Sequence, residues 1–509
     1  MKNIFTLFFT LTLPLLLLSQ EGEFDLSFNG DGKLILDLSY DDGATCVTMQ
    51  SDDKIVIGAT VNKAEVTSVL VRLDRYGNLD LTFGTLGIAD IRFPDFDPNV
   101  QDVAVQGDGK ILALSRTYRN SQSGLVINRF NANGSPDMAF GDTSMVFREG
   151  WYGSSYWNSI VAMPDGKFVV GGYAYFNSTG VSGILLGYNE NGSRNLAFGD
   201  SGMVKFSLGG STVQIEKLML SRNGKILAVG SGYAQGDKNF MIAQFNEDGT
   251  FYTPFGGNGI STIPFGDNAG AYDVAEQGDG KFVLAGDIYK NSEYQFAVAR
   301  ILSDGTLDQS FGSNGKVTTP ILNGDARAIS VSVLGDGKIL AAGEAEGIWN
   351  IDFALVRYRS DGSLDKSFNY DGISTKNMGS NDDEAEAAAI QPNGRLVLVG
   401  KTYENSFSSN VITAGRFLGG QGTVGFEELE NGDFALYPNP AKDFIQLEFE
   451  EFVNSIDLKL IDQQGRVVLE SIGSGYEVRM ELNALPKGLY MLQAELDGAV
   501  PVFRKVMVE

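Results

Sequence analysis

Histidine is absent from this 509-residue chain. Its absence excludes a Ser-His-Asp triad, a Cys-His pair, histidine-ligated zinc and histidine as a general base. The single cysteine, Cys46, cannot form an internal disulfide. It lies in the apolar run ATCVTM, which favours a buried strand residue over a nucleophile. The sequence must therefore fold without disulfides.

Basic residues are outnumbered, with 39 Lys and Arg against 64 Asp and Glu and a net charge of -25. This balance disfavours nucleic acid as a partner. Long apolar runs are missing after residue 20, so no membrane span is expected. Residues 1–20 have the pattern of a signal peptide, with Lys2, an apolar run and cleavage near Ser19 or Gln20.

Cofactor and metal motifs are also missing. The Gly-Lys pairs lack the upstream glycine and the following Ser or Thr of a phosphate-binding loop. The acidic stretch 380–387 lacks calcium-loop spacing, and a solvated loop explains Asp382, Asp383 and Glu384 better. We expect no cofactor and no metal.

What the chain does contain is a repeat. Three markers recur with one period: a phenylalanine in phrases such as LDQSFGSNGKV, a turn such as GDGK before an apolar run, and a segment such as FAVARILSDGTLD. The phenylalanines recur every 55 to 58 residues, at Phe28, Phe83, Phe140, Phe198, Phe255, Phe311 and Phe368. Each unit holds short Val/Ile/Leu/Phe runs between Gly/Asp/Asn turns, which predicts about four antiparallel strands.

A single four-stranded sheet cannot bury both of its faces, whereas seven arranged radially can. The predicted fold is therefore all-β: a seven-bladed β-propeller over residues 21–418, followed by a linker (419–433) and a small β-sandwich (434–509). The phrase around each phenylalanine is expected to cross from one blade to the next, with the ring filling the gap between sheets. The ring should close where the N-terminal phrase FDLSFNGDGKL meets VITAGRFLGG.

These markers resemble the delta-60 repeat family of bacterial propellers over roughly residues 24–418. The resemblance implies the propeller fold and no particular activity.

The tail shows strong strand alternation with turns at regular intervals. It resembles the type A sorting domain of the type IX secretion system. The matching residues are Tyr437, Pro438, Asn439, Pro440, Gly465, Pro486, Gly488, Tyr490 and Lys505. The resemblance implies a Bacteroidetes-type Gram-negative cell, the type IX machinery as a partner, and a secreted or outer-surface location.

Catalytic or binding residues should depart from the repeat. The clearest departure is WYGSSYW in the third unit, followed by GGYAYFN. The candidate ligand-binding residues are Trp151, Tyr152, Tyr156, Trp157 and Tyr175. Other units place Tyr118, Tyr233, Tyr289, Tyr403 and Trp349 in comparable loops. Exposed aromatics of this kind stack on sugars or anchor proteins, and the alternative is packing between blades.

We therefore predict a secreted or cell-surface, non-catalytic propeller that binds a polysaccharide or a surface protein. A carboxylate-based polysaccharide hydrolase or lyase is the first alternative, because such chemistry needs no histidine. Two close acidic residues at the mouth of the propeller, outside the repeat, would favour it. A structural adhesin component is the second alternative, because fold alone does not decide function.

Overall fold

The computed structural model contains two compact units, residues 1–421 and 422–509, which are considered separately. No helix of a length and apolarity suited to crossing a membrane occurs in the part of the chain it describes. The predicted signal peptide and most of the linker fall outside that part. The described residues are 21–39, 41–63, 66–91, 98–119, 122–149, 154–176, 180–234, 236–322, 324–391, 393–419, 435–437, 441–461, 467–482, 485–496 and 502–508.

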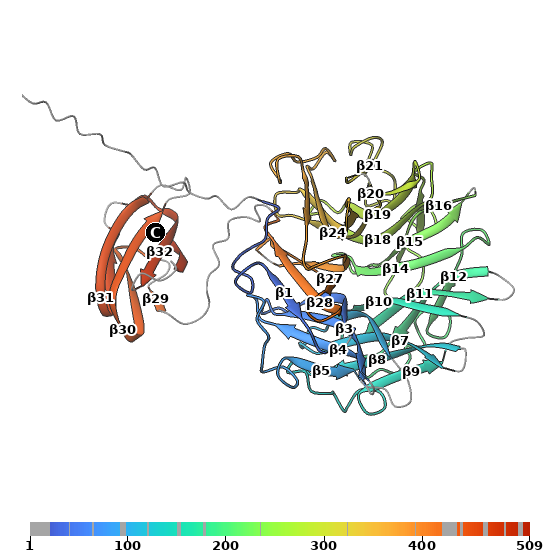
Figure 1. Ribbon diagram of the computed structural model, residues 1–509, viewed down its shortest axis with the longest axis horizontal. Coiled ribbons are helices and arrows are strands. Elements are labelled where there is room, and N and C mark those ends of the chain that lie inside the picture. The colour runs from blue at the N-terminus through green and yellow to red at the C-terminus, as the bar shows by residue number, and fades with distance from the viewer. Residues whose placement is uncertain are drawn as a thin grey trace, which may run out of the picture. The chain divides into compact units, whose positions relative to one another are not determined.

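The first unit consists of seven four-stranded antiparallel sheets, which confirms the predicted seven-bladed propeller (Figure 1). Within blades 1 to 6 the strands are hydrogen-bonded in chain order. The first strands of successive blades contact one another, so they surround the axis and the fourth strands lie outermost. This arrangement buries both faces of every central strand.

Blades 1 to 3 have the following strands: β2 (Gly43–Met49), β3 (Ile55–Lys63), β4 (Val66–Leu73) and β5 (Ile88–Ile91); β6 (Asn99–Val105), β7 (Ile111–Arg119), β8 (Gln122–Phe130) and β9 (Met145–Glu149); β10 (Ser155–Ala162), β11 (Phe168–Phe176), β12 (Gly180–Tyr188) and β13 (Met203–Phe206). Blades 4 to 6 have β14 (Val213–Leu220), β15 (Ile226–Ala234), β16 (Asp237–Phe245) and β17 (Ile260–Ile263); β18 (Ala269–Glu276), β19 (Phe282–Lys290), β20 (Glu293–Ile301) and β21 (Lys316–Thr319); β22 (Ala326–Val333), β23 (Ile339–Glu346), β24 (Ile351–Tyr358) and β25 (Ile373–Lys376).

Blade 7 closes the ring with strands from both ends of the unit. It contains β26 (Asp383–Ile390), β27 (Leu396–Glu404) and β28 (Ser409–Phe417), and its outermost strand is β1 (Lys33–Leu36). β1 pairs with β28 from Lys33 opposite Gly415 to Leu36 opposite Ile412, and Figure 1 shows the blue β1 beside the orange β28. The predicted meeting of the two ends is confirmed.

Seven apolar clusters hold the ring together, one between each pair of neighbouring blades. Each contains one of the repeated phenylalanines, fully or almost fully buried. Phe311, for example, packs between Val298 of blade 5 and Val356 of blade 6. The expectation that the ring fills the gap between sheets is confirmed.

The path of the repeated phrase differs from the expectation. LDQSFGSNGKV begins after β20 and runs into β21, so it joins the third and fourth strands of one blade. The crossing between blades is made instead by the segment between a fourth strand and the next first strand, such as the one from Thr319 to Ala326. The expectation was wrong because the phenylalanine contacts the next blade while its backbone stays in its own.

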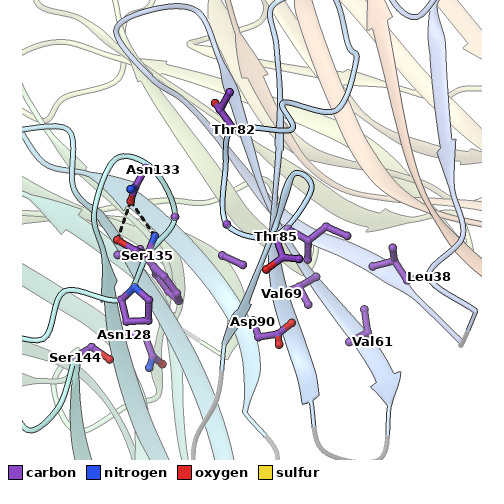
Figure 2. A pocket seen from close by; sticks show the side chains of 16 residues that line it. Leu38, Val61, Val69, Thr82, Thr85, Asp90, Asn128, Asn133, Ser135 and Ser144 are labelled. Atoms are coloured by element: carbon purple, nitrogen blue, oxygen red, sulfur yellow. Dashed lines mark hydrogen bonds between the residues drawn. The ribbon is translucent and has the colours of Figure 1, made fainter.

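A crevice of about 830 Å³ lies beside the outer strand of blade 1. Figure 2 shows Thr85 and Asp90 of blade 1 on one side and Asn128 and Ser144 of blade 2 on the other. Turn residues also line it, including Asn133, whose Oδ1 accepts bonds from the backbone N and the hydroxyl of Ser135 at 3.0 and 2.8 Å. Such turns recur in the repeat, and the crevice therefore gives little indication of a specific site.

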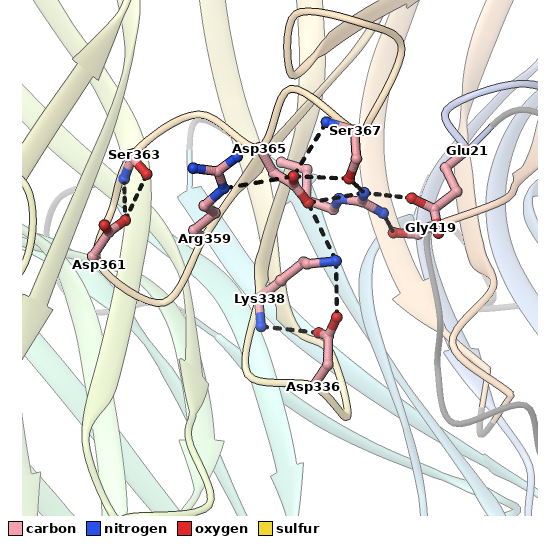
Figure 3. A network of polar contacts seen from close by, with 10 residues as sticks. Glu21, Asp336, Lys338, Arg359, Asp361, Ser363, Asp365, Ser367 and Gly419 are labelled. Atoms are coloured by element: carbon pink, nitrogen blue, oxygen red, sulfur yellow. Dashed lines mark hydrogen bonds and ion pairs between the residues drawn. The ribbon is translucent and has the colours of Figure 1, made fainter. Parts of the chain in front are cut away.

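A second repeated device joins the blades on the side where the third strands end. In blade 5, Arg300 forms an ion pair with Asp308 at 2.9 Å, lies 4.7 Å from the centre of the Phe311 ring and donates to the Ser360 carbonyl of blade 6. In blade 6, Arg357 likewise meets Asp365 and donates to the Gly419 carbonyl at 2.9 Å. Figure 3 shows this network of polar contacts, with Asp365 and Gly419 labelled.

We call this arrangement the arginine clamp. It occurs in five blades, with Arg72, Arg129, Arg300, Arg357 and Arg416. A planar cation that donates to a carboxylate and a carbonyl through different nitrogens and also stacks on an aromatic ring is a role that arginine fills and lysine does not.

The second unit is built from β29 (Ala435–Tyr437), β30 (Phe444–Ile461), β31 (Val467–Glu481), β32 (Gly488–Leu496) and β33 (Val502–Val508). The prediction of a small all-β domain is confirmed, but the strands form one curled sheet. β30 is long enough to pair with β29 near its start and with β32 near its end. Ile445, Leu458 and Leu492 are fully buried in the core of this sheet.

Candidate functional site

The axial channel of the propeller is lined by the seven first strands, and each of them bulges at the same place. In β18 the pairing with β19 shifts between Ala271 and Asp273, so Tyr272 is the extra residue. The bulged residues of blades 1 to 7 are Thr45, Gln101, Asn158, Glu216, Tyr272, Ile329 and Glu386. A bulge redirects a side chain and breaks pairing locally, which is why bulges are common beside binding sites.

Glycine on the second strand makes room for this bulge. A Cβ placed on Gly286 would lie 1.9 Å from the Gly270 carbonyl oxygen, a distance that no real side chain tolerates. Gly172, Gly230, Gly343 and Gly400 are in the same situation. In these five blades the glycine that ends runs such as KFVLAG leaves room for the bulge, whereas blades 1 and 2 have Ala59 and Ser115 at the same paired position.

Three residue positions around the bulge differ from blade to blade. The first strands follow a pattern in which the second and fifth of five positions are apolar, as Ala271 and Val274 are in blade 5. The first, third and fourth positions carry no common residue type: Asn99, Gln101 and Asp102 in blade 2 correspond to Gln214, Glu216 and Lys217 in blade 4. Aligning the first strands by sequence would have revealed these positions, because they break an otherwise strict repeat.

These positions gather at one end of the channel. First strands begin there and second strands end there, and we call this side of the propeller the rim face and the end of the channel the mouth. A cavity of about 700 Å³ opens at the mouth. Its ionisable lining residues are the acids Asp102, Glu216, Asp273, Glu344, Glu384 and Glu386 and the bases Arg116, Lys217 and Arg327.

An ion cluster crosses the channel at the level of the fourth position. Lys217 of blade 4 reaches Asp102 of blade 2, with 3.0 Å between Nζ and Oδ1, and thus spans blade 3. Burial lowers the pKa of Lys217, but the nearby Asp102 and Asp273 carboxylates more than offset it, and the net shift is upward. The upward shift favours the ammonium form of Lys217, which is not nucleophilic.

The carboxylates of this cluster also tie neighbouring first strands together. Asp102 accepts from the Ser159 hydroxyl at 2.7 Å and from the backbone N of Ile160 at 3.0 Å. Asp273 accepts in the same way from Ser330 at 2.8 Å and Val331 at 2.9 Å. Burial raises the pKa of Asp273, and Lys217 opposes the rise.

Three glutamates from blades 6 and 7 form an acidic wall of the cavity. Glu384 pairs with Lys401 at 2.8 Å, and Glu344 accepts from the backbone N of Ala385 at 3.2 Å. Burial raises the pKa of Glu386 to about 7; Lys401 opposes this rise, and Glu344 and Glu384 add to it. Burial likewise raises the pKa of Glu344. These carboxylates lie outside the repeat pattern, which is the arrangement that we set as the criterion for the enzyme alternative.

An aromatic cluster lies on the rim face of blade 3. The Tyr156 and Tyr173 rings are stacked with centroids 4.8 Å apart, and the Tyr175 ring meets both edge-on. The Arg116 guanidinium lies 5.3 Å from the centre of the Tyr156 ring and donates to the Trp157 carbonyl at 3.1 Å. Two of the predicted ligand-binding residues, Tyr156 and Tyr175, are thus brought together.

Trp157 has a different place. It is 1% exposed and packs between blades 2 and 3 with Leu112 and Phe168. Its position in β10 is the apolar second position, which Ile215 fills in blade 4. Packing between blades, the alternative given for these aromatics, therefore describes Trp157. Trp151 and Tyr152 lie outside the described residues.

The remaining rim aromatics occupy one repeated position, the eighth residue of the second strand. Tyr175, Tyr233, Tyr289 and Tyr403 are 37–45% exposed there, and Tyr118 has the same position in blade 2. Trp349 lies in the hairpin turn of blade 6 and is 91% exposed. Among the described residues, a stacked tyrosine pair on this face occurs in blade 3, whereas blade 5 has a tilted pair, Tyr289 and Tyr294, with ring centroids 5.0 Å apart.

Cys46 lies where the sequence indicated, whereas the solvated-loop interpretation of the acidic stretch was wrong for Asp383, which is 0% exposed and begins β26. Cys46 is buried in β2, and burial raises the pKa of its thiol to about 12. Asp383 accepts from the backbone N of Met378 at 2.6 Å and of Gly379 at 3.2 Å. Within the described residues, no group of three or more acidic or cysteine side chains is arranged to hold a metal ion.

The sorting-domain residues are spread over the second unit. Tyr437 ends β29, Gly488 begins β32, and Lys505 lies in β33 opposite Met491. The buried Tyr490 hydroxyl donates to the Pro486 carbonyl at 2.7 Å. Pro438, Asn439, Pro440 and Gly465 lie outside the described residues.

Solved structures show a distant likeness. The extracellular domain assigned to a one component system from B. thetaiotaomicron is 10% identical with a TM-score of 0.40, and the match covers 92% of this chain and 56% of that one. PorZ from Porphyromonas gingivalis is 14% identical with a TM-score of 0.35 and covers 91% and 65%. The polysaccharide lyase Uly1 is 12% identical with a TM-score of 0.46 and covers 74% and 90%. The chain thus spans less than two thirds of the first two, and at these TM-scores the likeness carries no argument about function.

Family models match both units, whereas no curated protein matches the sequence. A domain of unknown function (DUF5122) β-propeller matches residues 50–83, 106–140, 164–198, 277–311 and 334–368. A secretion system C-terminal sorting domain matches residues 435–509. The sorting domain implies interaction with the type IX machinery and a secreted or cell-surface location. The chain is a protein of DUF5122 β-propeller repeats that ends in a C-terminal type IX secretion sorting domain.

Proposed function

We propose that this exported propeller is a non-catalytic binding protein that holds a neutral polysaccharide at the mouth of its channel. One observation carries the proposal: the residues that differ between blades gather at one end of the channel, next to a stacked tyrosine pair found in one blade. A site that only supported the fold would be expected to repeat like the rest of the blade.

The chemistry of the mouth suits sugar rings. The Tyr156–Tyr173–Tyr175 cluster offers aromatic faces for stacking, and the amides of Asn99, Gln101 and the neighbouring lining residues offer hydrogen-bond partners. The cavity lining has six acids and three bases, which disfavours uronates and sulfated sugars. The hydroxyls of a neutral polysaccharide carry no charge and are not repelled by these carboxylates.

A glycan array probed with the full chain tests the proposal. We expect binding to neutral oligosaccharides, and we expect Tyr173→Ala/Tyr175→Ala to weaken it at least about tenfold, the loss typical of an aromatic anchor. Tyr233→Ala is the matched control, because Tyr233 has the same strand position as Tyr175 in the next blade and similar exposure. Absence of binding to any glycan, or equal losses in the variant and the control, would reject the proposal.

A carboxylate-based polysaccharide hydrolase or lyase is the second candidate. It is favoured by Glu386, whose pKa is raised to about 7 and whose neighbours Glu344 and Glu384 line the same cavity. A carboxyl that titrates near neutral pH can act as a general acid or base. New reducing ends from a bound neutral polysaccharide, or ultraviolet-absorbing unsaturated products from one that contains uronates, abolished in either case by Glu386→Gln, would establish this candidate in place of the first.

A further inference from the structure

The hairpin turn of blade 6 carries two large apolar side chains in almost complete contact with solvent. The turn joins β23 to β24 and is closed by a hydrogen bond from the Gly347 backbone N to the Asn350 carbonyl at 2.8 Å. Ile348 is 89% exposed and Trp349 is 91% exposed. Leu322 lies beside the turn, with its Cδ1 3.7 Å from where a Cβ on Gly347 would stand, and is 54% exposed. We call Leu322, Ile348 and Trp349 the apolar tip.

Carboxylates surround the apolar tip. Asp382 accepts from the backbone N of Ile351 at 3.0 Å, and Asp352 accepts from the Asn377 amide at 3.2 Å. Asp325 and Glu346 meet through a backbone bond of 2.7 Å from Glu346 N to the Asp325 carbonyl. None of these four carboxylates has an ion-pair partner in the described ranges.

A basic side chain of the same blade is already engaged elsewhere. Arg327, the second residue of β22, lies 3.6 Å from Asp287 and 4.1 Å from the centre of the Tyr294 ring. The four carboxylates are therefore available to a positively charged partner.

Blades 5 and 7, whose corresponding turns are described in full, do not share this arrangement. The corresponding turn of blade 5 has Asn291 and Ser292, and that of blade 7 has a single aromatic, Phe407, at 48% exposure. Adjacent large apolar residues that are nearly fully exposed are uncommon on soluble proteins and mark interaction surfaces. Tryptophan is enriched among residues that dominate protein–protein binding energy.

We propose that the apolar tip docks into an apolar pocket of a partner protein whose rim carries lysine or arginine. The aliphatic Ile348 and Leu322 have no hydrogen-bonding groups to offer a sugar, whereas they fill a protein pocket well. The four carboxylates provide the charge complementarity, which steers encounter and selects basic partners. The tip residues do not line the channel cavity, so this site is separate from the proposed polysaccharide site.

A phage-displayed random-peptide library selected on the full chain tests the proposal. We expect the enriched peptides to combine large apolar residues with lysine or arginine, and Trp349→Ala to weaken their binding at least about tenfold. Asp325→Asn/Glu346→Gln should weaken it less, with a smaller loss at high salt. Phe407→Ala is the matched control and should bind like the wild type.

Three results would overturn the proposal. They are acidic or purely polar enriched peptides, peptide binding that survives Trp349→Ala, and loss of glycan rather than peptide binding in that variant. Because Trp349 is so exposed, the substitution should leave thermal unfolding unchanged, and that measurement separates a lost contact from a lost fold.

Discussion

Replacement of Arg300 tests how the arginine clamp stabilises the ring. The guanidinium meets the Asp308 carboxylate at 2.9 Å, and the two side chains are 6% and 8% exposed. In Arg300→Gln the Asp308 carboxylate stays buried and keeps its ion pair with Lys281, at 3.5 Å. Removing one partner of a buried ion pair costs about 3–5 kcal/mol, and because Lys281 still balances part of the charge, the lower end of that range applies. We expect a loss of that size in the free energy of unfolding.

Blade 4 shows how the fold manages without the clamp. At the positions of Arg300, Asp308 and Ser310 it has Gln244, Tyr252 and Pro254. Asp308 accepts from the Ser310 backbone N at 3.1 Å, but proline has no N–H and needs no such acceptor. Lys225, the counterpart of Lys281, lies 5.0 Å from the centre of the Tyr252 ring. The arginine and the aspartate are thus lost together.

The triple variant Arg300→Gln/Asp308→Tyr/Ser310→Pro transfers the blade 4 solution to blade 5. It leaves no buried charge without a partner, so we expect it to regain at least about 2 kcal/mol relative to Arg300→Gln. Equilibrium unfolding in urea, followed by tryptophan fluorescence, gives the three midpoints for wild type, single and triple variants. A triple variant as unstable as the single one would refute the reasoning, since the buried charge would then not be the source of the loss.

Acid provides an independent measurement of the same pair. Burial raises the pKa of Asp308, but its bonds with Ser310 and the charges of Arg300 and Lys281 outweigh this and hold it at about 2, below its usual 3.8. A depressed pKa contributes stability above pH 3.8 that is lost as the pH falls towards 2. The pKa difference between the usual 3.8 and the folded value of about 2 corresponds to about 2 kcal/mol of folding free energy. The stability gap between wild type and triple variant should narrow over that range.

Further substitutions separate the scaffold from the site. Trp157→Ala should cost about 3–5 kcal/mol in urea unfolding because the ring is buried, whereas Tyr175→Ala should cost less than about 1 kcal/mol. Gly286→Ala should lower the free energy of unfolding by about 1–3 kcal/mol, because its Cβ would overlap the Gly270 carbonyl, whereas Gly107→Ala, whose Cβ would meet no atom within 4 Å, should not. Glu386→Gln should gain thermal stability relative to wild type as the pH rises from 5 to 7.5: the raised pKa means that the unfolded chain releases this proton first, so wild-type stability falls over that range. A stability difference between Glu386→Gln and wild type that does not change with pH would contradict the raised pKa of Glu386.

The repeat made the propeller predictable, and the same repeat concealed the site. Phe311 and its counterparts predict seven blades because each interface between blades buries one phenylalanine at the same position. Whether the backbone crosses there could not be predicted, because a ring can contact the next blade from either side of the crossing. Trp157 drew attention as a departure in composition, yet it fills a regular apolar position. The residues that differ between blades at the bulge, such as Gln101 in blade 2 and Glu216 in blade 4, are ordinary polar residues. Their shared location is evident only in the structure, where the bulges place them around one mouth.

Stability and binding overlap at only one level of this propeller. The clamps lie where third strands end, away from the mouth, and Tyr175 lies on the rim without supporting an interface. Asp102 does both: it accepts from Ile160 of the next blade and holds Lys217 across the channel. Removing the charge of Asp102 alters both the ion cluster that crosses the channel and the seam between blades 2 and 3. Substitutions at the rim therefore cost the fold little, whereas substitutions of Asp102 disturb the channel and the seam between blades together.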